Sequence, residues 1–154
     1  MRINTSSRYS VRALFDLAFH GGGGPTQVKD ISRRQKLSQR YLEQIFNRLV
    51  RNGLLKSKRG PRGGYMLARD PGRITVGEII LAVQGPIVPV ACLANGTLKG
   101  GACAMMRECV TRHLWRETQR RLTSYYDSVT IADLCEMANQ LGLKRDPTVD
   151  SNPT

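Results

Sequence analysis

Residues 30–67, DISRRQKLSQRYLEQIFNRLVRNGLLKSKRGPRGGYML, contain the strongest indication of the fold. It contains most of one short helical pattern, residues 26–35, and the whole of a second, from about residue 39 to residue 52. Ser38 can cap the second helix, and Gly53 stands where a left-handed residue would end it. Two short helices joined by a few residues predict a helix-turn-helix. The apolar stripe of the second helix is Leu42, Ile45, Phe46, Leu49 and Val50.

Two strand-like runs follow, at residues 54–58 and 65–67, with the turn residues RGPRGG between them. A hairpin placed directly after a recognition helix is the wing of a winged helix. Arg59 and Arg62 at its tip suit phosphates or a narrow minor groove. We therefore expect a mainly α fold with a small β-hairpin: a winged helix-turn-helix DNA-binding domain plus a long dimerisation helix.

The polar face of the second helix carries residue types that read base edges. Arginine and glutamine can make bidentate contacts with guanine and adenine in the major groove, and glutamate can accept from cytosine. The alternative is an ordinary solvated helix face. The candidates on this face are Gln39, Arg40, Glu43 and Gln44.

Positive charge is concentrated in the first half of the chain. The formal net charge is +12, and residues 1–70 carry 15 Lys and Arg against 4 Asp and Glu, a net of +11. A one-sided basic surface attracts polyanions because neutralised phosphates release counterions. This favours double-stranded DNA as the partner. No apolar run approaches the roughly 18 residues of a membrane span, and the N-terminus lacks a secretory core, so we expect a cytoplasmic protein without a membrane partner.

Further helices are expected on both sides of the central stretch. Capping residues 5–7 precede a first helix that ends at the glycine run 21–24, and Thr75 with Glu78 has the spacing of a capping box. A long helical pattern from about Met106 to Asp127 exceeds what such a small domain needs. It is expected to pair with its copy in a homodimer, which suits a palindromic operator. Its stripe is Val110, Leu114, Thr118, Leu122 and Tyr125 or Tyr126.

A last short helix is opened by Thr130 and Asp133. We expect Ile131, Leu134, Cys135, Ala138 and Leu141 on its apolar side, with Cys135 as a small buried residue.

Residues 92–113, CLANGTLKGGACAMMRECVTRH, hold three of the four cysteines and one of the two histidines; we call them the cysteine segment. Cytosolic cysteines favour metal or redox roles over disulfides. His113 follows Cys109 by four residues, which on a helix places both on one face. Three thiolates and an imidazole fit an iron-sulfur cluster, and equally a tetrahedral zinc site. A metal-free thiol redox switch is a further alternative.

An enzyme is not expected, because the sequence contains no paired catalytic carboxylates and no nucleophile motif. From Met1 to about Leu141 the chain instead resembles the iron-sulfur cluster regulator (IscR-like) branch of the Rrf-two family of winged-helix transcription regulators. The matching stretches are RYSVRAL at 8–14, residues 30–67, ITVGEIILAV at 74–83, CVTRHLW at 109–115 and SVTIADL at 128–134.

The resemblance implies a homodimeric bacterial repressor or activator whose DNA affinity depends on a cluster held by Cys92, Cys103 and Cys109. A 2Fe-2S cluster is favoured over 4Fe-4S, with zinc as the alternative, and cluster-assembly proteins are candidate partners. Glu43 takes the place of a residue that helps to discriminate operators by cluster occupancy. The positions that look like DNA contacts are Ser38, Arg40, Tyr41, Gln44 and Arg59.

The chain departs from the family pattern at two points in the cysteine segment. Ten residues separate Cys92 from Cys103, whereas about five are usual; a longer loop closes at an extra cost of roughly 0.6 kcal/mol per doubling. Arg112 stands where the pattern has a histidine ligand, and His113 comes one residue later. Because both positions neighbour Cys109 on a helix, His113 is the candidate fourth ligand, with Glu108 as a local alternative.

Four parts are expected along the chain. They are the DNA-binding domain, 1–84; the cluster-binding loop, 85–105; the dimerisation and C-terminal helices, 106–143; and a disordered tail, 144–154.

Overall fold

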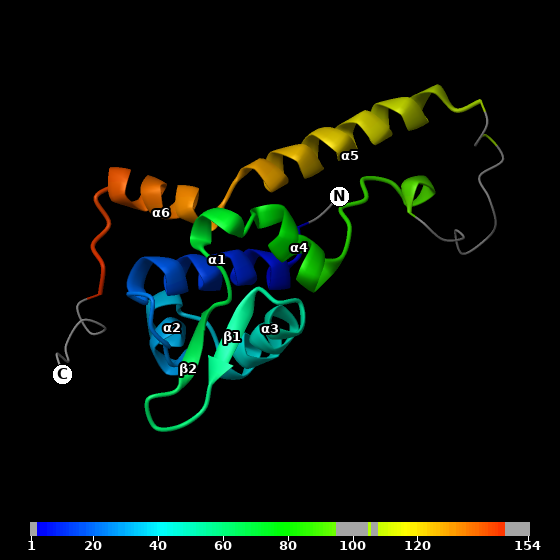
Figure 1. Cartoon of the computed structure of the whole chain (residues 1–154). Coiled ribbons are helices and arrows are strands. Elements are labelled where there is room, and N and C mark those ends of the chain that lie inside the picture. Colours follow the sequence, from blue (N-terminus) through cyan, green and yellow to red (C-terminus); the bar gives the residue numbers. More distant parts are fainter. Residues whose placement is uncertain (1–2, 95–104, 106–107, 147–154) are drawn as a thin grey trace.

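The first helix, α1 (Thr5–His20), lies at the centre of the fold (Figure 1). The structure is a computed structural model, and it describes residues 3–94, 105 and 108–146. Within these residues, α2, α3 and the hairpin lie on one side of α1, and α4, α5 and α6 lie on the other. The remaining elements are α2 (Val28–Gln35), α3 (Gln39–Arg51), β1 (Leu55–Lys58), β2 (Gly64–Leu67), η1 (Pro71–Arg73), α4 (Val76–Gln84), η2 (Ala91–Leu93), α5 (Val110–Ser128) and α6 (Ile131–Gln140).

The main core forms where the apolar stripe of α3 meets α1. Leu42, Ile45, Phe46 and Leu49 of α3 are buried, as the helical spacing predicted, while Val50 is only partly buried. Burying a side chain of this size contributes about 1.5–3 kcal/mol, so these contacts hold α3 in place and leave its polar face free. Their partners include Ala13, Leu14 and Leu17 of α1, Ile31 of α2 and Leu55 of β1.

A buried ion pair joins α1 to α2. Asp16 is completely buried, and Arg34 donates to it from Nε at 3.1 Å and from Nη2 at 2.6 Å. Gln35 Nε2 donates to the same carboxylate at 2.9 Å. A charged residue on a surface helix ordinarily faces solvent, but the side chain of Arg34 is only 9% exposed. A buried carboxylate needs such a partner, which draws the arginine inward.

Helix caps agree with the sequence in α4 and α6. Both have complete capping boxes, formed by Thr75 with Glu78 and by Thr130 with Asp133. At α1 the expectation is wrong by one position, because Asn4 is the N-cap and Thr5–Ser7 already belong to the helix. An asparagine side chain accepts from the first turn as well as a serine does, and Asn4 Oδ1 accepts from Ser7 N at 2.8 Å.

Strands β1 and β2 pair antiparallel, with Leu55 opposite Leu67 and Lys58 opposite Gly64. Beyond this pair, Thr26 and Tyr65 exchange two backbone hydrogen bonds of 2.9 Å, which join the hairpin to the segment before α2. A Cβ on Gly64 would lie 2.3 Å from Thr26 O. Only glycine permits this close approach, so Gly64 determines how the wing meets the helix-turn-helix.

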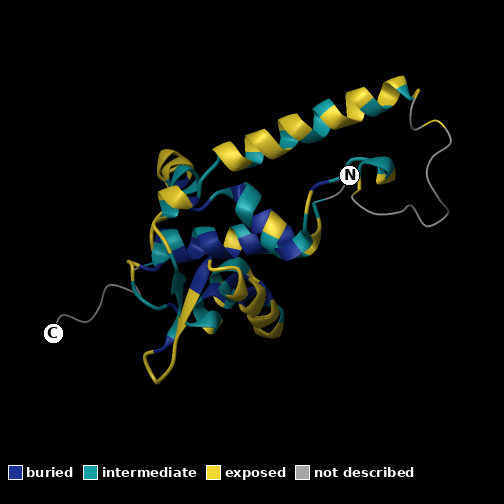
Figure 2. Cartoon of the chain, turned by 45° about the vertical axis from the view of Figure 1, so that its right-hand side comes forward, coloured by how far each residue is buried: buried dark blue, intermediate teal, exposed yellow. Residues whose placement is uncertain are grey.

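Helix α5 begins at Val110, and not near Met106 as its pattern predicted. Cys109 is its N-cap, with extended backbone angles (φ −77°, ψ 99°). No residue of α5 is buried, and Figure 2 shows the helix extending from the core as a largely exposed rod. Its C-terminal end is held against α4, where Val76 N donates to Val129 O at 2.8 Å.

Helix α6 packs back onto α1. Ile131 and Ala138 are buried, and Leu134 and Cys135 are half-buried against the core. Leu141 does not continue this stripe, because it lies at the C-cap and is 78% exposed.

The first residues of the expected tail contact α1 and α2. The Asp146 amide donates to His20 Nδ1 at 2.8 Å, and its carboxylate lies 3.3 Å from Arg33 Nη2. Arg145 lies over the ring of Phe19. Residues 147–154 lie outside the described part of the chain.

Candidate DNA-binding surface and cysteine segment

The beginning of α3 presents the side chains expected to read bases. Gln39, Arg40, Glu43 and Gln44 are all exposed, because the opposite face of the helix is buried in the core. Ser38 is exposed at the N-cap position, where its side chain makes no capping hydrogen bond. Major-groove recognition helices contact bases with their N-terminal residues. The geometry places the predicted residues on the part of α3 that such a contact requires.

Tyr41 differs from its neighbours on α3. It is half-buried, and its ring meets the ring of Tyr9 edge-on at a centroid distance of 5.8 Å. Its hydroxyl and that of Ser6 share a hydrogen bond of 2.7 Å. The predicted contact residue is therefore also a link between α3 and α1.

The wing carries its two tip arginines, Arg59 and Arg62, on the surface. Gln27 Nε2 donates to Pro61 O at 3.3 Å and so holds the tip toward the start of α2. Exposed lysines of α2, of its C-cap and of β1 extend this basic surface; they are Lys29, Lys36, Lys56 and Lys58.

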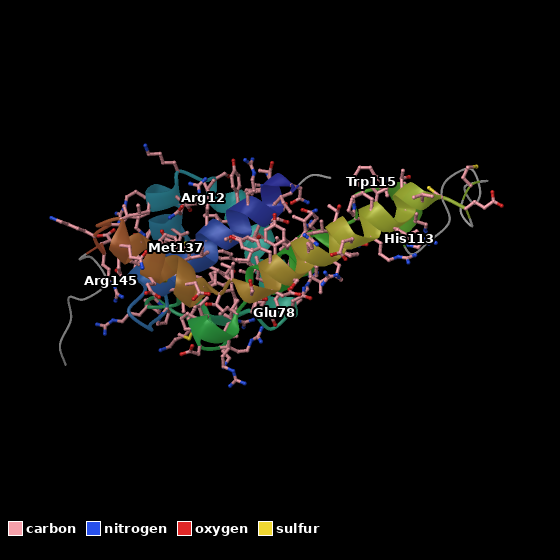
Figure 3. All side chains as sticks on the ribbon, turned by 90° about the horizontal axis from the view of Figure 1, so that it is seen from above. Arg12, Glu78, His113, Trp115, Met137 and Arg145 are labelled. Carbon is pink, nitrogen blue, oxygen red and sulfur yellow. The ribbon has the colours of Figure 1, made fainter. Side chains whose placement is uncertain are left out.

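The two described cysteines of the cysteine segment lie next to α5. Cys92 is half-buried in η2, which packs against α5, and Cys109 is half-buried at the N-cap of that helix. His113 is exposed in the first turn, and Figure 3 shows it leaving α5 on a different side from Trp115. Cys103 lies outside the described residues. Cys109 is the N-cap and precedes the helix, so it does not share a helical face with His113 as the spacing predicted.

The surroundings of Cys109 lower the pKa of its thiol. A hydrogen bond of 3.2 Å with Thr111 Oγ1 is the largest cause that lowers its pKa below the ordinary 9.0, and the Arg112 backbone and charge add to it. Arg112 also has a buried Nε with no hydrogen-bond partner among the described atoms. Thiolate is the form of cysteine that binds metals. The Nε of Arg112, which lacks a hydrogen-bond partner, would favour an anionic group bound beside it.

Cys135 is a different kind of thiol. It lies on α6, at the opposite end of the molecule from η2 (Figure 1), and burial raises its pKa. Among the described residues, no three His, Cys, Asp or Glu side chains lie close enough to hold a metal ion. Cys135 is therefore set apart from the predicted ligands.

A winged helix-turn-helix with an exposed polar recognition helix and a basic wing defines a DNA-binding transcription regulator. The whole-chain comparisons agree. The chain matches the Rrf2 family, described as iron-dependent transcriptional regulators, over residues 3–137, and it belongs to that family. No helix of the described ranges is long and apolar enough to cross a membrane.

Individual relatives are transcription regulators of the same kind. The chain is 42% identical over 134 residues to the HTH-type transcriptional regulator IscR of Cronobacter sakazakii, covering 87% of this chain and 80% of the relative. The IscR of Klebsiella pneumoniae is also 42% identical, with 87% and 79% covered. This chain is therefore a DNA-binding regulator of the IscR type, and these relatives are transcription regulators and not enzymes.

Solved structures confirm the fold. CymR (YrzC), the global cysteine regulator of B. subtilis, superposes with a TM-score of 0.74 at 37% identity, covering 89% of this chain and 98% of that one. IscR of T. potens gives a TM-score of 0.74 at 34% identity, covering 95% and 94%.

Proposed function

We propose that this chain is a homodimeric, cytoplasmic transcription regulator whose affinity for a palindromic operator is switched by an iron-sulfur cluster. Cys92, Cys103 and Cys109 are the proposed ligands, and His113 is the candidate for the fourth position. The observation that carries the proposal is the union, in one IscR-type chain, of an exposed recognition helix and a cysteine segment beside the long helix α5.

The DNA part of the proposal rests on which side chains are exposed. The candidates for base reading are Gln39, Arg40, Glu43 and Gln44, on the first two turns of α3. Ser38 at the N-cap and the wing residues Arg59 and Arg62 would contact phosphates or the minor groove. Tyr41 also belongs to the predicted contact set, although its hydroxyl is bonded to Ser6.

The homodimer rests on the exposed apolar surface of α5. Val110 is 80% exposed, Leu114 57% and Tyr125 62%, whereas most of the stability of a helix in a protein comes from packing of its apolar face. A groove of about 990 Å³ runs between α4 and α5, and Ile80, Leu81 and Tyr126 are among the residues that line it. A second copy of α5 would cover these surfaces and bring two recognition helices to the two halves of a palindrome.

The cluster rests on the chemistry of the donor set. A bound cluster would supply a redox-active, oxygen-sensitive centre. The residues of this chain would hold it through Cys109, whose pKa is lowered by Thr111, and through Cys92 in η2 beside the same helix. The charge of Arg112 favours the thiolate of Cys109. We favour 2Fe-2S over 4Fe-4S, and assembly proteins would deliver either type.

Two alternatives use the same cysteines. A structural zinc site would need the same thiolates, and a metal-free redox switch is favoured by one observation, the lowered pKa of Cys109, because thiolates are the reactive form. These alternatives differ in colour and in composition, so one preparation separates them.

The test is purification without oxygen, followed by an absorption spectrum and assays of iron, acid-labile sulfide and zinc. A cluster gives visible absorbance with iron and sulfide in similar amounts. Colourless protein with about one zinc per chain would replace the cluster by zinc. Protein without metal whose cysteines pair under oxidant would favour the thiol switch. Cys135→Ala is the control and should leave the spectrum unchanged, whereas Cys109→Ala should abolish it.

A further inference from the structure

One side-chain amide ties the end of α4 to the beginning of α1. Gln84, the last residue of α4, accepts with its Oε1 from Asn4 N and from Ser7 Oγ, each at 2.9 Å. Ser7 is completely buried, so its hydroxyl cannot exchange this partner for bulk water. The first turn of α1 is therefore held to the position of Gln84.

The neighbouring residue connects the same turn to the recognition helix. Ser6 Oγ and Tyr41 Oη share a hydrogen bond of 2.7 Å, and Tyr41 lies in the first turn of α3. Arg40 and Glu43, on either side of Tyr41, are exposed. A shift of the first turn of α1 would therefore act on the part of α3 that meets DNA.

On its other side, Gln84 adjoins the chain that leads to Cys92. Gly85 follows it with a positive φ of 87°, and Ile87 is buried against Val76 and Ile80. Gln119 of α5 donates to Ile87 O at 2.8 Å. The chain between Gln84 and Cys92 is thus anchored to both α4 and α5, and a movement of either η2 or α5 reaches Gln84 through packed atoms.

We infer that Gln84, Ser7, Ser6 and Tyr41 are positioning residues that couple the cysteine segment to the recognition helix. The inference deepens the proposed function and rests on it. In this account the hydroxyl of Tyr41 acts through Ser6 and not on a base. Its loss should change the difference in operator affinity between cluster-loaded and cluster-free protein.

The test measures operator affinity for both forms of each variant. Protein is reconstituted with iron and sulfide without oxygen, or stripped with a chelator, and titrated by fluorescence anisotropy with a duplex that the wild type selects from a random pool. Tyr41→Phe and Ser6→Ala each remove one oxygen of the shared hydrogen bond. A neutral hydrogen bond corresponds to about a fivefold change, so each should reduce the ratio of the two affinities by about that factor.

A double-mutant cycle makes the test specific. Because the two hydroxyls share one bond, the double variant Ser6→Ala/Tyr41→Phe should match either single variant. Gln84→Leu, which removes the acceptor for Asn4 and Ser7, should reduce the ratio as well. Thermal unfolding of each variant identifies loss of folding. Variants that leave the ratio at the wild-type value, or that shift both affinities by one common factor, would overturn the inference.

Failure of the proposed function gives a different pattern. Arg40→Ala should weaken operator binding in both forms. Wild-type affinity of this variant would contradict the proposed DNA-binding surface. Equal operator affinity of the cluster-loaded and cluster-free wild type would contradict both the switch and the coupling. The coupling alone would be contradicted if the two wild-type forms differ in operator affinity and Tyr41→Phe and Ser6→Ala keep the same ratio of affinities.

Discussion

Among single residues, substitution of Arg40 gives the most direct prediction about DNA binding. It is exposed in the first turn of α3, so Arg40→Ala should lower operator affinity by about 1–3 kcal/mol and relax the sequence preference at one position. Arg51→Ala is the matched control, because Arg51 is exposed at the other end of the same helix. Competition binding with single-base operator variants measures both effects. Equal losses from the two substitutions would contradict the assigned orientation of α3.

His20 predicts a dependence of stability on pH. Burial, the largest cause, lowers its pKa below 6.5 and outweighs the carboxylates of Asp16 and Asp146. The unfolded chain then binds more protons than the folded chain, so the free energy of unfolding falls as pH drops through and below about 6.5. Protonation of Nδ1 also removes the acceptor for the Asp146 amide.

Urea unfolding at about pH 7.5 and about pH 5.5 measures this effect. His20→Asn should show a smaller difference between the two pH values than the wild type. His113→Asn replaces the other histidine, which is exposed, and should retain the wild-type difference. A wild-type dependence that survives in His20→Asn would assign the effect to other groups.

Single residues also mark where sequence patterns stop being informative. An arginine on a surface helix ordinarily faces solvent, and only the three-dimensional contact with the buried Asp16 shows that Arg34 is buried. Asp146 could not be expected to contact His20 and Arg33, which lie far from it in the chain. Contacts of this kind depend on how distant segments meet, and periodicity contains no information about that.

At the scale of elements, the wing provides a stability prediction. A Cβ on Gly64 would lie 2.3 Å from Thr26 O, so Gly64→Ala should force the hairpin away from the segment before α2 and destabilise the protein by more than about 1 kcal/mol. Gly24→Ala is the control, because its Cβ would make an ordinary contact of 3.8 Å. Chemical denaturation compares the two. Equal stability of both variants would contradict the docking of the wing.

Elements with local signals were predicted well. The amphipathic stripe of α3, the capping boxes of α4 and α6 and the hairpin each follow from residues close together in the chain. The beginning of α5 was not predicted, because nothing local distinguishes Met106 from Val110 as a helix start. The candidate contacts on α3 and the wing were found from residue type and family resemblance, whereas the second role of Tyr41 required the structure.

For the whole molecule, the exposed apolar side chains of α5 lead us to expect a dimer in which two copies of this helix pack together. Leu114→Glu places a charge on the exposed apolar side of this helix and should convert the dimer to monomer in sedimentation velocity. Leu141→Glu alters another strongly exposed leucine, away from α5, and should remain dimeric. Wild-type protein that sediments as a 17.2 kDa monomer at micromolar concentration would contradict the dimer.

In the whole molecule, the elements that carry Cys92 and Cys109 lie apart from the recognition helix. Figure 1 shows α5 and η2 on one side of α1, with α3 and the wing on the other. Helix α4 contacts α1, α3 and α5, so α1 and α4 both connect the two sides. A coupling free energy of 1–3 kcal/mol between two such sites is typical. That is the energy of a few hydrogen bonds, which is the scale of the contacts around Asn4, Ser6 and Ser7.

The proposed switch is tested by the operator affinity of one preparation, measured without oxygen before and after removal of its iron and sulfide. We expect the affinity to change about 5–150-fold, and we expect a Cys92→Ala/Cys103→Ala/Cys109→Ala variant to bind like the stripped protein in both conditions. Equal affinity before and after removal would contradict it.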